Sequence, residues 1–286
     1  MNFSFLFIIF IAFGSSIFAH GNSSTTSYPF TENKGQWHEN VLFKSRVDGA
    51  TIYFEKNAFH YQFLSKPDYH LGNIPEDTMA RGHIFKAQFL NANNQVEIST
   101  IRSSDFYYNY YLGDNESKWQ SEVRSFSAIR YSNLYNGIDL EVYSENGFTK
   151  YDYIVETGSN PNQIAVQYFG VNKPVIKDGQ LVISHELGEL IEEKPFAYQV
   201  INGIKTKVNC NYKLNESGIL QFEFPEGYDA DFDLIIDPKL IFSTYSGSTA
   251  DNFGETATYD DLGNGYMGGI ADGQQYILTI GAYQTV

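Results

Sequence analysis

The sequence lacks most of the features that mark a disulfide-stapled protein, a nucleic-acid binder or a membrane protein. It holds one cysteine, Cys210, so no internal disulfide can form and the hydrophobic core must supply the stability. Lys and Arg number 19 against 34 Asp and Glu, a formal charge of −15, which disfavours nucleic acid and anionic membrane surfaces as partners. After the first 19 residues, no apolar segment approaches transmembrane length.

The first residues read as a targeting segment. Phe3–Phe13 is an apolar run, Gly14-Ser15-Ser16 interrupts it, and Ala19 offers a cleavage position. The run is too short to span a bilayer, which favours a signal peptide over an anchor. We therefore expect a signal peptide at 1–19 and a small, polar, disordered lead-in at 20–29. The mature chain is then expected to be secreted, either extracellular or on the cell surface, with no membrane span.

What the sequence does contain is aromatic residues and short alternating runs. Aromatic residues make up 16% of the chain, with 22 Tyr and 23 Phe, as is typical of β-rich extracellular proteins. Apolar and polar residues alternate in runs of four to eight, separated by Gly, Pro, Asn and Asp, and no amphipathic helix pattern follows the signal peptide. The pattern predicts an all-β domain at 30–238, with antiparallel, sandwich-like sheets in one lobe or two.

Composition changes at Lys239. Residues 239–286 are rich in Gly and small polar residues, with three or four very short apolar runs between glycine turns. This is typical of one β-propeller blade, which cannot bury its faces without neighbouring blades. We interpret 239–286 as a first, incomplete propeller-type repeat, and we expect the chain to be a C-terminally truncated piece of a longer protein.

The strongest local signal is a hairpin over Ile138–Val155. Two alternating runs flank Asn146-Gly147, the dipeptide favoured by two-residue type I′ turns. Such a turn fixes the register, so Leu140 should face Tyr153 on an apolar side of the hairpin. On the other side, Glu141 should lie directly opposite Asp152.

These carboxylates are the candidate site. Glu141 and Asp152, with Asp139 two residues along the strand, could form an acid/base pair or a Ca²⁺ site. The simpler interpretation is a solvated acidic face whose repulsion is relieved by Lys150, which lies diagonally from Glu141. We expect no catalytic residue, no cofactor and no metal, and keep Asp139, Glu141 and Asp152 as candidate Ca²⁺ ligands.

The sequence also predicts the settings of an aromatic run and of the single cysteine. The run Phe106–Tyr111 is aromatic at all but one position, which places rings on both faces of a strand. It predicts burial on both faces or a position that lines a groove. Cys210 alternates with Val208 and Tyr212, which predicts a buried and unreactive thiol.

The remaining motifs favour structural roles. His70 and His83 fall in a polar loop with no third ligand indicated. His185-Glu186 begins like a zincin helix but lacks the second His and lies in a strand–turn–strand pattern. Asp229-x-Asp231-x-Asp233 resembles the start of a calcium loop without its glycine or its final Glu, so only looser Ca²⁺ binding stays open.

Several motifs carry a resemblance to a known family. They are Phe30-x-Glu-Asn-x-Gly-Gln-Trp37, Tyr131-x-Asn-Leu-Tyr-x-Gly-Ile-Asp-Leu140, Lys150-Tyr-Asp152, Pro225-Glu-Gly-Tyr228 and Ile236-Asp-Pro238. Together they resemble the uncharacterised N-terminal domain of secreted Bacteroidetes-type proteins with β-propeller (SBBP-type) repeats. The resemblance implies a domain that precedes a propeller in proteins that often carry adhesion modules, and it supplies no catalytic residues.

Two functions remain from these observations. The first is a non-catalytic scaffold or interaction module, secreted or at the cell surface, that precedes a β-propeller and acts in adhesion or surface assembly. Its partner would be a protein or a glycan. The alternative is a carbohydrate-binding module or glycoside hydrolase that uses exposed aromatic rings with Glu141 and Asp152.

Overall fold

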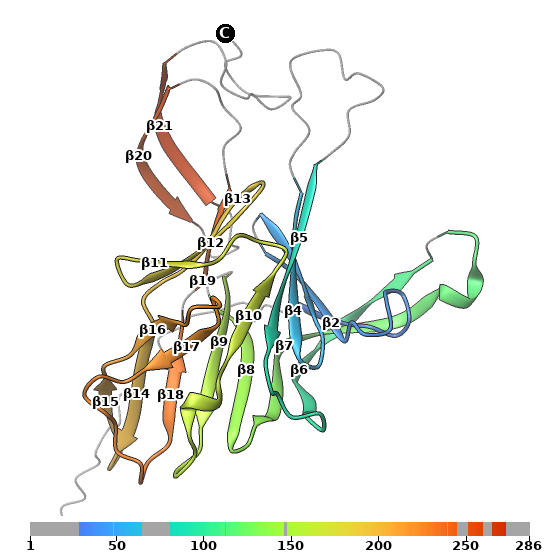
Figure 1. The fold of residues 1–286 in the computed structure, drawn as a ribbon. Coiled ribbons are helices and arrows are strands. Elements are labelled where there is room, and N and C mark those ends of the chain that lie inside the picture. The colour runs from blue at the N-terminus through green and yellow to red at the C-terminus, as the bar shows by residue number, and fades with distance from the viewer. Residues whose placement is uncertain are drawn as a thin grey trace, which may run out of the picture.

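The computed structural model describes residues 29–47, 49–64, 81–111, 113–145, 148–238, 240–244, 251–259 and 265–272. The expected signal peptide and nearly all of the lead-in lie outside these residues, as do His70 and Asn146-Gly147. Within the described chain the fold is all-β and every paired strand is antiparallel, as predicted (Figure 1). The helical elements described are two short 3₁₀ turns, η1 (Glu116–Lys118) and η2 (Pro161–Gln163). No helix in this described part is long or apolar enough to cross a membrane.

Most of the domain is one large, strongly curved sheet, here called sheet A. Its strand order is β15-β14-β18-β9-β8-β7-β1-β2-β3-β4-β5-β10-β17-β16, with β6 paired to β7 off this path. The strands are β1 (Phe30–Glu32), β2 (Phe43–Val47), β3 (Ala50–Phe54), β4 (Ala58–Leu64), β5 (Gly82–Phe89), β6 (Glu97–Tyr110), β7 (Gln120–Tyr135), β8 (Ile138–Glu145), β9 (Phe148–Val155), β10 (Val166–Phe169), β14 (Phe196–Ile201), β15 (Ile204–Val208), β16 (Asn211–Leu214), β17 (Leu220–Glu223) and β18 (Leu234–Asp237).

Two smaller sheets complete the described strands. Sheet B has the order β11 (Val175–Lys177), β12 (Gln180–His185), β13 (Gly188–Glu192) and β19 (Leu240–Thr244). A separate hairpin pairs β20 (Asp251–Tyr259) with β21 (Gly265–Asp272). β19 belongs by sequence to the expected propeller repeat, yet it pairs with β13. Strand pairing therefore crosses the expected boundary at 238/239.

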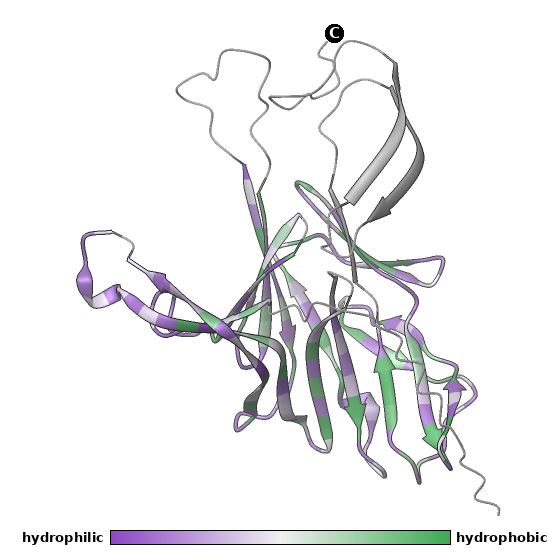
Figure 2. Ribbon diagram, turned by 180° about the vertical axis from the view of Figure 1, so that it is seen from behind, coloured by the Kyte–Doolittle hydropathy of each residue, from purple (hydrophilic) through white to green (hydrophobic). Residues whose placement is uncertain are grey.

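The central hairpin has the predicted register. Leu140 lies opposite Tyr153 and Glu141 opposite Asp152 along β8 and β9. Leu140 and Tyr153 are fully buried, because alternation along each strand turns every second side chain to the core. Figure 2 shows the same alternation as hydrophilic and hydrophobic segments along the neighbouring central strands.

The alternating pattern also predicts a second hairpin, in which Ala197–Ile201 and Lys205–Leu214 pair across Asn202-Gly203, and this prediction is confirmed in part. β14 and β15 pair across Asn202-Gly203, and both turn residues have positive φ (52° and 81°), as a type I′ turn requires. The prediction of one continuous strand at Lys205–Leu214 is wrong. The chain leaves the sheet at Asn209-Cys210, so β15 pairs with β14 while β16 pairs with β17. An alternating pattern continues through such a break because the residues on both sides face the same core.

The core is rich in aromatic residues that sheets A and B share. The ring of Phe59 meets Phe54, Phe89 and Tyr131 with centroids 4.8, 4.9 and 6.0 Å apart. Leu181, Ile183 and Leu190 of sheet B belong to the same buried cluster. Cys210 is buried at 2% exposure and is a free thiol, and burial raises its pKa to about 12, which agrees with the predicted inert role.

One part of sheet A leaves the core. β6 and β7 continue beyond the body as a two-stranded ribbon, seen projecting to the right in Figure 1. We call residues 103–125 the arm. It comprises the end of β6, the turn with η1 and the start of β7.

Candidate functional site

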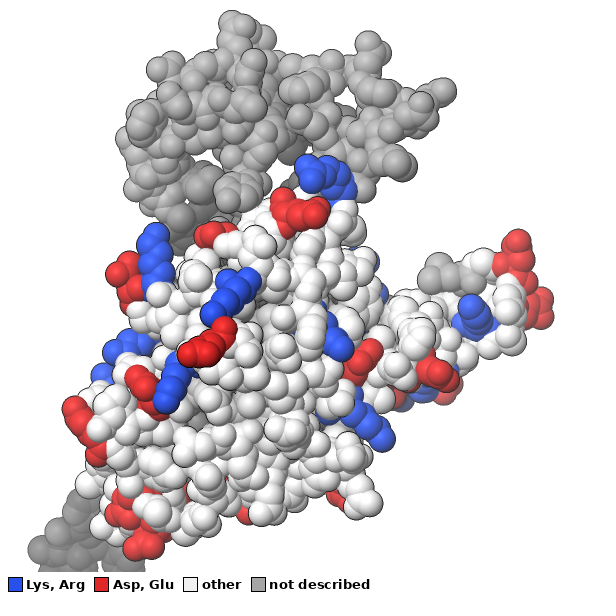
Figure 3. All heavy atoms as spheres, in the orientation of Figure 1, with Lys and Arg blue, Asp and Glu red and all other residues white. Residues whose placement is uncertain are grey.

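The arm displays the largest group of exposed aromatic side chains in the described chain. Phe106, Tyr107, Tyr108, Tyr111 and Trp119 are between 39% and 64% exposed. Of the two alternatives predicted for 106–111, burial on both faces is therefore wrong, and a position that lines a groove stays a prediction. An aromatic run shows that rings lie on both faces of a strand, but it does not show whether another layer covers those faces. Here neither face is covered by another layer. In Figure 3 uncharged atoms form much of the visible surface of the arm.

The bend that carries the arm away from the body is held by specific hydrogen bonds. Arg102 and Glu122 have left-handed backbones (φ 47° and 55°), and the β6–β7 register shifts between Ser103 and Tyr107. The Arg124 Nη1 donates to the carbonyl of the buried Ser104 at 3.1 Å, and the Glu122 N–H donates to Asn109 Oδ1 at 3.1 Å. Such bulges twist and redirect a strand pair, so the arm points outward by construction.

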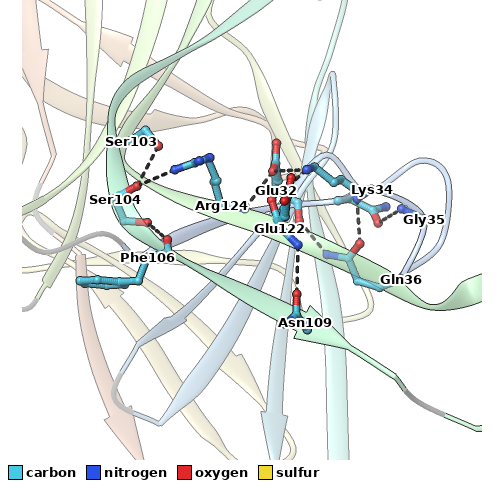
Figure 4. A network of polar contacts seen from close by, with 11 residues as sticks. Glu32, Lys34, Gly35, Gln36, Ser103, Ser104, Phe106, Asn109, Glu122 and Arg124 are labelled. Atoms are coloured by element: carbon cyan, nitrogen blue, oxygen red, sulfur yellow. Dashed lines mark hydrogen bonds and ion pairs between the residues drawn. The ribbon is translucent and has the colours of Figure 1, made fainter.

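The loop that follows β1 clamps this bend (Figure 4). Lys34 Nζ donates to the Glu122 carbonyl at 2.8 Å, and Glu32 Oε1 accepts from the Arg124 N–H at 2.8 Å. Within the loop, Asn33 Oδ1 accepts from the N–H groups of Gly35 and Trp37. The first family motif thus serves to hold a loop against the arm.

Two ring contacts lie near the outer end of the arm, where Tyr110 ends β6 opposite Gln120. Trp37 of the loop packs edge-on against Tyr110, with ring centroids 5.6 Å apart, and Lys44 Nζ lies 4.5 Å from the centre of the Trp37 ring. Near the turn, Tyr111 and Trp119 pack at 5.6 Å, and Trp119 Nε1 donates to the Gly113 carbonyl. Tyr110, Tyr111 and Trp119 are therefore preorganised, which lowers the entropy cost of binding a partner.

The second candidate site is a row of charged residues across four neighbouring strands. Arg130 on β7 lies opposite Glu141 on β8, which lies opposite Asp152 on β9. β18 pairs with β9 so that Ile236 faces Tyr153, which brings Asp237 beside Asp152. The sequence predicts the facing of Glu141 and Asp152, but Arg130 and Asp237 are not foreseen because they lie on other strands.

Asp139 departs from its predicted setting. It is buried at 8% exposure and accepts hydrogen bonds from Arg130 Nη2 at 2.8 Å and from the Asn133 N–H at 2.7 Å. Asn133 has φ 52° and lies where the β7–β8 register shifts. Asp139 thus holds a bulge and neutralises Arg130, so the interpretation of a solvated acidic face is wrong for this residue. A carboxylate that accepts a backbone N–H and pairs with a guanidinium can be buried at low cost.

Arg130 is also an ion-pair partner of Glu141, which the sequence does not predict. Its Nη1 lies 3.4 Å from Glu141 Oε2. Lys150 lies opposite Tyr143 in the hairpin, and it lowers the pKa of Asp152 only weakly.

Asp152 has the most perturbed carboxyl of the row. Burial first, then the neighbouring Asp237, raises its pKa to about 7, and the charge of Glu141 adds to this rise. The Tyr143 hydroxyl donates to Asp152 at 3.3 Å and opposes the rise. A carboxyl that titrates near neutrality beside a second carboxylate is a pattern of acid/base sites, although buried structural networks produce it as well.

No group of three or more His, Cys, Asp or Glu side chains converges as metal ligands within the described residues. Two residues of the calcium-loop resemblance have local roles instead. Asp233 Oδ1 accepts from the Thr157 N–H at 2.8 Å and from its hydroxyl at 2.9 Å. Asp229 Oδ1 accepts from the Asp231 N–H at 3.0 Å. Both are capping contacts of turns.

Of the histidine predictions, the one for His185 is confirmed and the one for His83 is wrong. His185 ends β12 and precedes the turn to β13, as the strand–turn–strand interpretation requires. His83 lies in β5, so its placement in a polar loop is wrong. The two rings stack with centroids 5.3 Å apart, and His185 also lies 4.0 Å from the ring of Phe63. Burial, then the charge of His83, lowers the pKa of His185 to about 4.

A buried carboxyl that no motif indicates joins the two sheets. Glu192 of β13 is 2% exposed, and its Oε2 accepts from the hydroxyls of Tyr151 at 2.8 Å and Tyr212 at 3.2 Å. Burial raises its pKa to about 7, against the opposing hydrogen bonds of Tyr151, Tyr212 and Tyr168. The signal was present in the sequence, because alternation from Leu190 directs Glu192 inward.

Comparison with known proteins gives a family and nothing finer. The family model described as Domain of unknown function (DUF7948) matches residues 30–239. The chain belongs to this family. No curated protein and no solved structure matches the chain. The DUF7948 match spans sheet A, β11–β13 of sheet B and the arm, so both candidate sites lie inside the family domain.

Proposed function

We propose that this DUF7948 domain is a non-catalytic interaction module whose contact surface is the arm. The observation that carries the proposal is the group of half-exposed Tyr, Phe and Trp rings on a projecting ribbon. Tyr, Trp and Phe are enriched at protein interfaces and dominate their binding energy. The bulges and the loop clamp hold these rings in place away from the body, where a partner can reach them.

The wider setting follows the resemblance in the sequence. We place the module in a secreted or cell-surface protein, ahead of a β-propeller, with a role in adhesion or surface assembly. An arm that projects from a rigid all-β body suits such a role, because the body can be tethered while the arm makes contact. No cofactor is needed for this function.

The test compares two double variants in an adhesion assay. Beads coated with the protein are scored for adhesion to one another and to a panel of immobilised polysaccharides. Tyr107→Ser/Tyr111→Ser should abolish the adhesion seen with wild type. Glu141→Gln/Asp152→Asn, the matched control on the carboxylate row, should retain it. Loss of adhesion in the control variant alone would refute the assignment of the arm.

The carboxylate row favours a second candidate, a glycoside hydrolase. Asp152, with its pKa near 7, would be the general acid, and Glu141, paired with Arg130, would be the second carboxylate. Release of reducing ends from the polysaccharide panel by wild type, and its loss in Glu141→Gln/Asp152→Asn, would establish this reaction. The proposed function predicts no release from either protein.

The same variant tests Ca²⁺ binding at the row. Arg130 already supplies positive charge to Asp139 and Glu141, so we expect Ca²⁺ to leave the melting temperature unchanged. A Ca²⁺-dependent rise in wild type that the double variant lacks would instead assign a cation site to Glu141 and Asp152.

A further inference from the structure

The arm presents aromatic rings on both of its faces, whereas a flat contact surface needs them on one face only. Tyr107 and Tyr108 are consecutive in β6 and both about half exposed, and consecutive side chains of a strand point to opposite faces. Both faces of the ribbon therefore present rings. In addition, β6 pairs with β7 alone among the described strands, so its other edge is free.

Such a ribbon is a poor structure on its own. A two-stranded hairpin in water is only marginally stable without a third strand or a layer that covers one face. The described chain provides only partial cover, where Trp37 packs on Tyr110. The arm thus has the properties of an element that is completed by association.

The arrangement of the rings fits a protein surface better than a sugar chain. Trp37 and Tyr110 meet at 76°, and Tyr111 and Trp119 at 70°, so neighbouring rings stand edge-on rather than in one plane. A sugar chain stacks along one face of rings that share an orientation. Edge-on rings on two faces make pockets into which the side chains of another protein pack.

We propose that the occupant is a second copy of this chain, with two arms packed face to face in antiparallel fashion about a twofold axis. The proposal rests on the proposed function and names the partner. The bulges at Ser103–Tyr107 favour packing of ring faces over strand addition, because a bulged edge resists pairing. A twofold axis makes the same rings serve both sides of the contact.

Charge along the arm agrees with this geometry. The turn carries Asp114, Glu116 and Lys118, a net charge of −1, whereas Lys44 lies on the Trp37 ring and Arg46 near Tyr110, farther back. Antiparallel packing moves the acidic turn of one arm toward the cations of the other. In a chain with a net charge of −15, such local complementarity offsets the repulsion between two acidic bodies.

Face-to-face packing covers the rings of one face of the ribbon only. Five rings that each bury roughly 150–250 Å² when covered, and are about half exposed here, offer on the order of 500 Å² on the two faces together, so one face supplies on the order of 250 Å² per copy. A standard interface buries about 800 Å² per partner, so this contact is a small one, as in a weak monomer–dimer equilibrium.

The experiment measures self-association of the wild-type protein over a concentration series by analytical ultracentrifugation. Trp37 and Trp119 are the two tryptophans of the sequence and both lie on or against the arm. Tryptophan emission therefore reports the arm in the unmodified protein, without any variant. We expect a monomer–dimer equilibrium, with an emission shift to shorter wavelength that follows the dimer fraction.

Variants then assign the surface. Tyr107→Ser/Tyr111→Ser should weaken the dimer at least tenfold. The control Ile204→Ser should not, although Ile204, the first residue of β15, is 69% exposed. Asp114→Lys/Glu116→Lys should weaken the dimer relative to wild type, and the loss of affinity should be larger at low salt than at high salt, because salt screens the charges.

Three results would overturn the proposal. The first is a monomer at every concentration with constant emission, and the second is a dimer that the arm variant leaves intact. In the third, a monomer changes its tryptophan emission on adding a polysaccharide of the panel, which would make the occupant a glycan. That last result refutes the second copy and leaves the arm as the contact surface, so the two proposals fail separately.

Discussion

The buried Glu192 makes the stability of this domain depend on pH in an unusual direction. It lies between sheets A and B, where its carboxyl accepts hydrogen bonds from the hydroxyls of Tyr151 and Tyr212, and no cation pairs with it among the described residues. Burial raises its pKa from an ordinary 4.5 to about 7, so the folded state prefers the protonated acid. We predict that Glu192→Gln removes this preference while keeping an oxygen that accepts from the two tyrosines.

The sign and the size follow from proton linkage. Between pH 4.5 and 7 the unfolded chain has lost the Glu192 proton while the folded chain keeps it. The free energy of unfolding therefore falls as the pH rises through this window, by about 1.4 kcal/mol per pH unit and about 3 kcal/mol in all. The stabilising contribution is complete below pH 4.5 and absent above pH 7. The glutamine variant should gain about 3 kcal/mol relative to wild type over the same window.

Urea unfolding from pH 4 to pH 8 measures this difference directly. The quantity to follow is the stability of Glu192→Gln minus that of wild type, since other groups, Asp152 among them, titrate equally in both proteins. Glu216→Gln, at an exposed turn, controls for the loss of one negative charge and should give a flat difference. A flat difference for Glu192→Gln as well would refute the reasoning, because it would mean that the buried carboxyl does not bind its proton more tightly when folded.

Three further predictions follow from single contacts. Arg130→Met should destabilise the fold by about 2 kcal/mol in urea unfolding, because it leaves the buried Asp139 without its ion pair. Gly137→Ala should cost about 1–3 kcal/mol by the same assay, since Gly137 has φ 69° and an added Cβ would collide with Ser159 Oγ. Cys210 should resist a thiol reagent in the folded protein at neutral pH and react once urea unfolds it; rapid labelling of folded protein would contradict its burial.

The local pairing of this fold could be predicted, because it depends on residues close in sequence. Asn202-Gly203 predicts a hairpin that the structure contains, and the two-residue turn expected between β8 and β9 gives the register that places Glu141 opposite Asp152. Period-two alternation likewise predicts that Cys210 is buried. In each case one strand pair or one strand face suffices for the inference.

The rest depends on contacts that alternation does not encode. Arg130 reaches Asp139 because a bulge at Asn133 shifts the β7–β8 register, and a bulge has no reliable signal in one sequence. The arm is a second feature that alternation along one strand could not predict. Rings on both faces of a strand are expected when the strand lies between two layers, and Tyr107 and Tyr108 show the same pattern with no layer at all.

The sequence motifs that carry the family resemblance hold the backbone in place in the structure. Asn33 and Gly35 shape the loop that supports the arm, and Asn133, Gly137 and Asp139 form the bulge and turn between β7 and β8. These positions determine where the arm and the carboxylate row lie, yet most of the exposed rings fall outside them. In this chain the motif residues therefore support the arm and the turn between β7 and β8, and the exposed rings lie between the motifs. Substitution of the arm rings should accordingly change binding while leaving the fold intact, whereas substitution of the motif residues should lower stability and, by releasing the arm, weaken binding as well.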